Sequence, residues 1–512
     1  MQRSARVLAC ALFVMLAGCS SAAEEVEPTG NVNPGGGPGT PPEPEPAGPT
    51  TPTATCTMRA DVPLTYEEKR LVNRLPGKSV AFSEELLKGT GFDVFEPDFS
   101  KELCKDGIAG AATFDAAKAL VSAAGTRLWR AAVDRVQGRR PSGTLPAGDD
   151  RMLYWARLTM TKTLRAWAPS FELDAAKRAD LEWELERASR GQLDVKLPPG
   201  SNYVRVLVSG FDPFTLGTPG ATDDASIKIG NPSGASALAY DGYELTLPNG
   251  KTAHIEAFTL PVNYGPFERG MQEETLGPWF SAGPSQVDIS ITMSQGGGYR
   301  FKLEEYNGRY HGLFAGNDDV ATCNGSFLPS VDGCNIHPSA KWIGYDSRPW
   351  RIGQPPQFVE STLPVDKMIA ANTGTRVPRP PDSQAAGGNA FDVVWGYDYG
   401  IFTSCTASET QSLYSPVSTT YPPPVMPSPP SASTCARSGS GGDYLSNESA
   451  YRATLLRDVM GLTIPVGHIH TPVMTRFLAG NESEITDSKF EAYRAAIVLQ
   501  GRLLVEEVAK SL

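Results

Sequence analysis

The segment VRVLVSGFDPF, residues 204–214, is a nearly continuous apolar run that ends in a glycine turn carrying two phenylalanines, Phe211 and Phe214. Apolar residues at successive positions predict a strand that is buried on both faces, as the strands of parallel sheets are. In open α/β sheets, functional residues gather in the loops beyond the carboxyl ends of the strands. We therefore expect this turn to lie close to a site.

Strand and helix patterns alternate from residue 202 to residue 512. Short runs of β-forming residues are separated or followed by segments with helical periodicity. This alternation predicts a mostly parallel, open α/β sheet with helices on both faces over residues 202–512. The predicted strands are residues 202–211, 253–262, 286–294 and 461–469, and the predicted helices are residues 266–280, 364–372 and 489–512.

Residues 374–440 interrupt this alternation with sequence rich in proline, serine and glycine. Loops of this length are uncommon in a compact domain, because a chain without secondary structure leaves many backbone polar groups to satisfy. We interpret the stretch as a Pro/Ser-rich insertion in the α/β domain.

Residues 56–192 have a helical pattern throughout. Apolar residues recur there at steps of three and four, which predicts a small all-α domain. It contains no recognisable catalytic constellation, and its tryptophans and tyrosines are predicted to be core residues. The predicted helices are residues 64–75, 112–124, 126–138, 149–167 and 172–189.

The first 55 residues divide into an export signal and a tether. Residues 19–55 are rich in Pro, Gly and Glu and lack aromatic residues, so we expect a disordered tether that cannot bury enough apolar surface to fold. Residues 1–18 combine the basic start MQRSAR with a short apolar run, which is typical of a signal peptide.

The junction LAGCSS, residues 16–21, resembles a bacterial lipobox. The resemblance implies cleavage before Cys19, lipidation of Cys19, and a protein anchored in the bacterial cell envelope. It would face the periplasm or the surface, at the outer membrane in a Gram-negative cell. The alternative is an ordinary secretory signal in which Cys19 is incidental. No other run of about 18 apolar residues is present, so the lipid would be the only anchor.

The other cysteines indicate an oxidising compartment. The chain has eight cysteines; Cys10 would leave with the signal and Cys19 would carry the lipid, so six remain. An even number of cysteines in an exported protein predicts disulfides. Pairing of sequence neighbours favours Cys56 with Cys104, Cys323 with Cys334, and Cys405 with Cys435.

Charge and composition exclude several classes of partner. The formal net charge is -11, and no concentrated basic surface is recognisable, which argues against nucleic acid binding. The spacing of cysteine and histidine predicts no metal site, and no cofactor motif is present. The sequence leaves the oligomeric state unknown.

Several short motifs follow residues 204–214 in a definite order. Together they resemble pyroglutamyl peptidase I, also called pyrrolidone-carboxylate peptidase, over roughly residues 202–510 apart from the insertion. The resemblance implies an open α/β fold and removal of an N-terminal pyroglutamyl residue from peptides by a Glu, Cys, His triad. The motifs are NPSGASAL (231–238), TLPVNY (259–264), VDISITMSQGGGYRFKLEE (287–305), STLPVDKMIAA (361–371), GDYLSNESAYR (442–452) and GHIHTPV (467–473).

The resemblance assigns roles to particular residues. Ser446 occupies the position of the nucleophilic cysteine, and His470 that of the histidine. The glutamate falls on Glu304 or on Glu305, depending on whether one residue is deleted after the glycine run at 296–298. The implied substrate-binding residues are Phe211, Phe214, Gln295 and Asn231.

This set of residue types suits amide hydrolysis. A nucleophile attacks the carbonyl, a histidine takes its proton and returns it to the leaving amine, and a carboxylate orients the imidazole. A flat lactam ring also needs apolar walls and a few polar contacts at its edge.

Three departures from the family pattern bear on activity. Ser446 carries a hydroxyl where the family carries a thiol, which ionises far more readily. The family's arginine after the glutamate has no counterpart in step, Arg309 being the nearest candidate. Tyr299 stands where the family's glycine turn continues with arginine.

Simpler interpretations of the same residues also exist. Ser446 could cap a helix, since serine is a common N-cap residue. His468 would replace His470 as the base if the register were shifted by two, and Cys435 would be a displaced nucleophile if it were not paired with Cys405.

Two functions therefore stay open. One is a hydrolase acting on N-terminal pyroglutamyl peptides or a related cyclic amide, with Ser446 as the nucleophile. The other is a catalytically inactive, lipid-anchored relative that binds a peptide or takes part in an envelope interaction.

Overall fold

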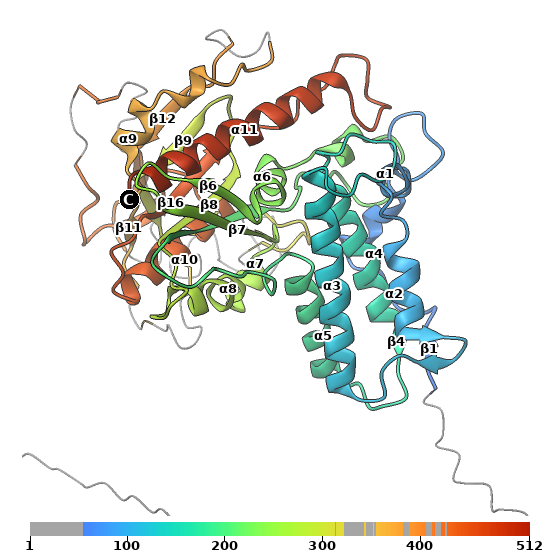
Figure 1. Cartoon of the computed structure of the whole chain (residues 1–512). Coiled ribbons are helices and arrows are strands. Elements are labelled where there is room, and N and C mark those ends of the chain that lie inside the picture. The colour runs from blue at the N-terminus through green and yellow to red at the C-terminus, as the bar shows by residue number, and fades with distance from the viewer. Residues whose placement is uncertain are drawn as a thin grey trace, which may run out of the picture. The chain divides into compact units, whose positions relative to one another are not determined.

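A seven-stranded sheet forms the C-terminal part of the protein (Figure 1). The computed structural model describes residues 55–312, 314–321, 343–344, 352, 355–381, 389–405, 412–414, 421–424 and 428–512. From one edge to the other, the strands are β12 (Val393–Gly396), β9 (Phe301–Glu304), β16 (Val466–Thr471), β8 (Ile289–Gln295), β5 (Tyr203–Phe211), β7 (Thr252–Leu260) and β6 (Tyr243–Thr246).

Four neighbouring strands of this sheet, β16, β8, β5 and β7, run parallel. The edge strand β6 is antiparallel to β7, while β9 and β12 run parallel to each other and antiparallel to β16. The predicted fold class, a mostly parallel sheet with helices on both faces, is confirmed.

The sequence of strand β5 is almost uniformly apolar because both faces of the strand pack in a core. Val204, Val206 and Val208 contribute to a core formed with helices α6 (Pro232–Tyr240) and α11 (Ser488–Lys510). Leu207 and Phe211 contribute to a second core formed with α8 (Met271–Phe280) and α10 (Leu445–Val459). Because successive side chains of a strand point to opposite faces, both sets must be apolar. Figure 1 shows these helices beside the sheet.

Five α-helices form the N-terminal region of the compact unit that spans residues 53–512. The sequence pattern predicts two helices at 112–124 and 126–138, but the single helix α3 takes their place. Gly125 lies where a Cβ atom would come within 2.7 Å of the Cβ of Ala188, so glycine here serves close packing of α3 on α5. The helices are α1 (Phe82–Thr90), α2 (Phe95–Leu103), α3 (Phe114–Val136), α4 (Met152–Ala166) and α5 (Ala175–Ala188).

The predicted helices at 149–167 and 172–189 correspond to α4 and α5, but one other helix prediction in this region was wrong. The predicted helix at 64–75 contains only the 3-10 turn Glu68–Val72. Pro76 and Gly77 follow closely, which leaves little chain for helix propagation. Helices α1 and α2 were not predicted.

The core of the helical region continues into the segment that follows β5. Leu216, Ile227 and Leu238 belong to the same hydrophobic cluster as Trp129 and Trp155. Trp129, Trp155 and Trp167 are fully buried, as predicted for core residues, whereas Trp183 is only partly buried. The boundary between an all-α domain and an α/β domain stays a prediction, but the two regions share apolar contacts.

The stretch interpreted as an insertion contributes regular structure. Strand β12 forms an edge of the main sheet, and three strands, β13 (Gly400–Phe402), β14 (Ser412–Tyr414) and β15 (Cys435–Ser438), form an antiparallel sheet. The disulfides Cys56–Cys104 and Cys405–Cys435 are present as predicted.

Short elements complete the described structure. Two-stranded antiparallel pairs join β1 to β4, β2 to β3, and β10 to β11. The remaining elements are β1 (Thr57–Met58), β2 (Cys104–Lys105), β3 (Ile108–Ala109), β4 (Trp167–Ala168), β10 (Tyr306–Gly308), β11 (Phe358–Glu360), α7 (Tyr264–Glu268) and α9 (Val365–Ala370).

Several predictions fall outside the described residues. They are the signal peptide, nearly all of the tether, the lipidation site Cys19 and the pair Cys323 and Cys334. Within the described part of the chain, no helix combines the length and apolarity needed to cross a bilayer.

Candidate active site

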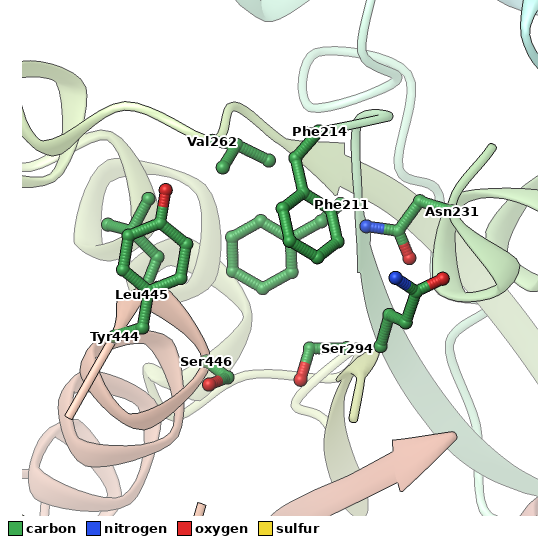
Figure 2. Close-up of a pocket in the computed structure, with 9 residues that line it drawn as sticks. Phe211, Phe214, Asn231, Val262, Ser294, Tyr444, Leu445 and Ser446 are labelled. Atoms are coloured by element: carbon green, nitrogen blue, oxygen red, sulfur yellow. The ribbon is translucent and has the colours of Figure 1, made fainter. Parts of the chain in front are cut away.

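A small pocket lies at the carboxyl ends of β5 and β8 (Figure 2). It encloses about 270 Å³ of space, part of which is open to solvent. Phe211 ends β5, Gln295 ends β8, and Ser446 lies in the first turn of α10. The pocket is lined by Phe211, Phe214, Asn231, Val262, Ser294, Gln295, Tyr444, Leu445 and Ser446. Five residues selected from the sequence therefore meet in one place.

The walls of the pocket are apolar. Phe211 stacks on Phe267, with ring centroids 6.2 Å apart. The opposite wall is Tyr444, whose hydroxyl donates a hydrogen bond to the carbonyl of Ala315 at 2.8 Å. Figure 2 shows the Phe211, Phe214 and Tyr444 side chains around the same space. Flat aromatic walls of this kind suit a flat ligand ring.

Two amide side chains supply the polar edge. The Asn231 Oδ1 caps helix α6 by accepting from the backbone N–H of Ser233 at 3.1 Å, and its Nδ2 donates to the carbonyl of Asp212 at 2.9 Å. Gln295 Oε1 accepts from the N–H of Met474 at 2.8 Å. Among the described residues, Gln295 Nε2 has no hydrogen-bond partner, so it remains available to a ligand carbonyl.

Ser446 is the second residue of α10. The N-cap is Tyr444, which makes no side-chain capping bond, so the interpretation of Ser446 as the N-cap was wrong. The Ser446 hydroxyl donates to the carbonyl of Gly441 at 3.4 Å. Within the described structure, the backbone N–H groups of residues 445–447 have no acceptor. Such groups at a helix start favour negative charge.

The carboxylate of Glu304 contacts Nδ1 of His470, and the two side chains form an ion pair when the imidazole is protonated. Glu304 is fully buried, whereas His470 retains slight exposure. Burial alone would raise the pKa of Glu304, but the neighbouring His470 and His468 more than offset it and bring the pKa to about 2. The carboxylate is therefore ionised, and it contacts the His470 imidazole at the Nδ1 edge of the ring.

Glu305 lies in a different environment. Its carboxylate accepts from Nε1 of Trp395 at 2.8 Å, and burial together with nearby Glu360 raises its pKa to about 7. Of the two glutamates left open by the sequence, Glu304 is the one that contacts His470. Adjacent strand residues point to opposite faces, which explains the separation.

The loop before Ser446 packs directly on this ion pair. At Gly441, a Cβ atom would lie 2.3 Å from Oε2 of Glu304. Only glycine fits there without displacing the carboxylate, since real Cβ atoms do not approach so closely. The loop that carries Ser446 and the strand that carries Glu304 are thus in contact.

His468 has a structural environment. Its Nδ1 and Nε2 atoms are each 2.7 Å from a hydroxyl, of Thr292 and Ser294 respectively. Burial lowers the pKa of His468 to about 3, so the ring is neutral. Two hydroxyl partners leave this imidazole no free nitrogen for catalysis.

Glu304, His468 and His470 are also close enough to be compared with a metal site, because one ligand atom from each lies within 4.8 Å of the others. Both ring nitrogens of His468 already bond to hydroxyls, and Nδ1 of His470 faces Glu304. The donor set is therefore committed to hydrogen bonds and an ion pair, and it does not fit a metal without rearrangement.

Ser446 and His470 stand at the positions that the sequence resemblance gives to a nucleophile and a base. Among the described residues, Ser446 Oγ forms no hydrogen bond with His470. Bonds between catalytic groups are often long without substrate and tighten when it binds.

Other sequence candidates lie away from the pocket. Cys435 is held in the disulfide with Cys405 and is not a resting nucleophile. The Arg309 guanidinium donates to the carbonyls of Ile343 and Pro355. Tyr299 packs under the guanidinium of Arg476, 4.4 Å from the ring centroid.

Four pocket residues were not selected from the sequence: Val262, Ser294, Tyr444 and Leu445. Each belongs to a quoted motif, Tyr444 lying two positions before Ser446 and Ser294 directly before Gln295. A search for apolar residues close to the candidate polar ones in the sequence would have found Tyr444 and Leu445 but not Val262.

Fold and site together define a mostly parallel α/β protein with an apolar pocket, a serine at a helix start and a buried Glu–His pair at the same end of the sheet. Residues 205–475 match the family described as PA0049, C-terminal domain, and residues 47–186 match the PA0049 N-terminal domain. The chain belongs to the PA0049 family.

One relative is the uncharacterized protein PA0049 of Pseudomonas aeruginosa. It is 48% identical over 508 residues, a match that covers 90% of this chain and 92% of the relative. Both the helical region and the sheet region therefore have counterparts in that protein.

Among solved structures, the chain is similar to pyrrolidone carboxyl peptidase of Pyrococcus furiosus. A mutant of that enzyme is 17% identical, with 60% of this chain and 99% of the other covered and a TM-score of 0.32. A second match, to a structure of the same enzyme and its cysteine-free mutant, is 19% identical over 59% of this chain and 99% of the other, with a TM-score of 0.32.

Proposed function

We propose that the protein is a hydrolase that removes an N-terminal pyroglutamyl residue, or a related cyclic amide, from peptides. Ser446 is the nucleophile, His470 the general base and Glu304 the residue that orients His470. The observation that carries the proposal is the meeting of Ser446, the aromatic walls and Gln295 in one pocket, beside the buried Glu304–His470 pair.

The proposed reaction is an acyl transfer through a serine ester. Ser446 Oγ attacks the carbonyl that links the pyroglutamyl ring to the next residue, and Nε2 of His470 takes the hydroxyl proton. The oxyanion is stabilised by the N–H groups at the start of α10. His470 returns the proton to the leaving amine, and a water then hydrolyses the ester with the same base.

The pocket supports selection for a small lactam. Phe211, Phe214 and Tyr444 would cover the faces of the ring, and Gln295 Nε2 would donate to its carbonyl. A site built to hydrogen-bond a polar group rejects analogues that lack it, because its own groups are then left unpaired.

We also propose that the protein acts in the bacterial cell envelope. The two disulfides support an oxidising compartment outside the cytoplasm. The lipobox resemblance at Cys19 supports attachment through a lipid. Mass spectrometry of the protein isolated from its own cells tests this part, because lipidation would appear as a modified peptide that begins at Cys19.

The second candidate is a catalytically inactive binding protein with the same pocket. It is favoured by the position of the Ser446 hydroxyl, which bonds to the Gly441 carbonyl and not to His470. A hydroxyl at the position that the sequence resemblance gives to a cysteine would then leave a pocket that binds a peptide end without cleaving it.

One experiment separates the candidates. The purified protein is incubated with a pyroglutamyl amide of a fluorescent amine, beside Ser446→Ala and Ser446→Cys. A serine hydrolase releases the amine and loses this activity in Ser446→Ala. If the wild type and Ser446→Ala are equally inert while Ser446→Cys gains turnover, the protein is the binding form.

A further inference from the structure

The loop that follows β5, residues 212–220, forms part of the pocket. Charged side chains of the helical region hold this loop in place. Asp212 lies between the pocket residues Phe211 and Phe214. Its Oδ2 accepts from Nη2 of Arg157 at 2.6 Å and from Nη2 of Arg190 at 2.7 Å. Arg157 lies in α4, and Arg190 follows Ser189, the C-cap residue of α5. A single carboxylate of the sheet region thus accepts hydrogen bonds from two guanidinium groups of the helical region.

All three side chains are nearly inaccessible to solvent. The charge is balanced by Glu186 of α5, whose carboxylate forms ion pairs with both Arg190 and Arg157. Two guanidinium groups and two carboxylates therefore form one cluster, called here the arginine clamp, in which Glu186 is partly exposed. A buried charge that loses its partner is strongly unfavourable, so each member of the clamp constrains the others.

The helical region holds the same loop at a second place. Arg70 Nε donates to the carbonyl of Gly217 at 3.0 Å. The Asn73 side chain donates to the carbonyl of Thr218 at 2.9 Å and accepts from the N–H of Gly220 at 2.7 Å. The loop over residues 212–220 is consequently attached to the helical region at both ends.

The clamp is connected to the pocket through the backbone. The carbonyl of Asp212 accepts from Asn231 Nδ2 at 2.9 Å, and the N–H of Phe211 donates to Ser233 Oγ at 3.0 Å. A shift of Asp212 would therefore move an aromatic wall and the amide edge together. Displacements of about 1 Å at a binding site can lower activity on the order of a hundredfold.

We infer that Arg157 and Arg190 are positioning residues, and that the helical region is a working part of the substrate pocket. They act through Asp212 on the aromatic walls that hold the cyclic amide. This inference rests on the proposed function for its substrate, while the clamp itself can be tested without any substrate.

The test compares Arg157→Met and Arg190→Met with the control Arg127→Met. Arg127 belongs to the same helical region but forms an exposed ion pair with Glu102. Kinetics on the pyroglutamyl amide should show KM raised about tenfold or more in the two clamp variants, with a smaller change in kcat. Arg157→Lys, which keeps the charge, should recover part of the loss, and the control should match the wild type.

Hydrogen exchange gives a readout that does not depend on turnover. The N–H groups of Phe211, Asp212 and Gly220 are hydrogen-bonded in the structure and should exchange faster in the clamp variants, while those within α10 stay protected. If a methionine variant does not fold, Asp212→Asn, which keeps the shape but removes the charge, takes its place.

The outcomes are distinct. Unchanged exchange and unchanged KM in folded clamp variants overturn the inference even when the wild type is active. An inert wild type whose residues 211–220 loosen in the clamp variants overturns the proposed hydrolase and keeps the clamp. Equal loosening of the whole chain would make the clamp a general stabiliser, which also overturns the inference.

Discussion

The sheet region contains two buried histidine–glutamate pairs. One is His470 with Glu304, in the strands β16 and β9. The other is His311 with Glu448, 2.8 Å apart, where Glu448 lies two residues after Ser446 in α10. Both glutamates are almost completely inaccessible, and both have a pKa below the ordinary value, because their charged partners more than offset the effect of burial.

The pairs differ in what else the carboxylate touches. Glu448 is also bonded by Arg452 Nε at 2.9 Å, and Arg452 in turn pairs with Glu273 of α8 at 2.8 Å. Glu304 is packed against Gly441 and has no arginine partner among the described residues. Glu448 therefore belongs to a network that fastens α10 to α8, while Glu304 acts on one imidazole. A buried His–Glu pair identifies an orienting carboxylate only when no stronger cation competes for it.

The largest expected effect is loss of turnover in Glu304→Gln. If Glu304 orients His470, kcat should fall on the order of 10³ to 10⁴, because a neutral amide no longer stabilises the imidazolium. The free energy of unfolding should change by about 1 kcal/mol. Steady-state kinetics and urea denaturation measure both quantities. Retention of most of the activity would remove Glu304 from the mechanism.

Arg452→Met should give the opposite result. Removing this guanidinium leaves Glu448 and Glu273 buried without their cation, which should lower the free energy of unfolding by about 3–5 kcal/mol. The folded fraction should keep its turnover, since Arg452 lies outside the pocket lining. A variant of normal stability but without activity would show that the second pair takes part in catalysis.

Glu305 is partly buried and has no cationic partner among the described residues, and this should make the free energy of unfolding depend on pH. Its pKa is raised to about 7 in the folded protein from an ordinary value of 4.5, so the folded state holds a proton that the unfolded state has lost between these values. Stability should therefore fall as pH rises from 4.5 to 7 and then level off. Relative to wild type, Glu305→Gln should gain at most about 3 kcal/mol between pH 4 and pH 8.

Urea denaturation at the two pH values checks this prediction. Glu172→Gln is a suitable control, since Glu172 carries an exposed carboxylate that has no ion-pair partner among the described residues. A stability difference that does not change with pH would show that Glu305 stays ionised when folded.

The smallest expected effect concerns His468. Thr292→Val removes one of its two hydroxyl partners and should cost about 1–2 kcal/mol, because a buried ring nitrogen is left unsatisfied. The pH dependence of kcat should stay as in wild type. A displaced pH profile would mean that His468, and not only His470, titrates during turnover.

The fold could be predicted largely from the alternation of patterns. Strand β5 agrees with the predicted residues within one position, because a strand buried on both faces has a distinct composition. Strand β12 could not be found this way, since it is short and lies within Pro- and Gly-rich sequence. The continuity of α3 across Gly125 was also hidden, because the packing of α5 that explains this glycine is a tertiary contact.

For the candidate site, the resemblance selected five residues that line one pocket, but it left the choice between adjacent residues open. Glu304 and Glu305 differ by one position, and the antiparallel pairing that sets Glu304 opposite His468 comes from strand register. The arginine clamp had no sequence signal at all, since Arg157 and Asp212 are 55 positions apart in the chain. Isolated charged residues of this kind look like ordinary surface residues until the fold buries them.

Gly441 has a consequence for reading related sequences. The Glu304 carboxylate occupies the space that a side chain at position 441 would need. The residues allowed at the two positions therefore depend on each other. We expect family members that keep the Glu304–His470 pair to keep glycine at this position, and those that have lost the glutamate to tolerate larger residues there. Comparing the residues at these two positions across related sequences would then separate proteins that keep the Glu304–His470 pair from proteins that have lost it, before any of them is expressed.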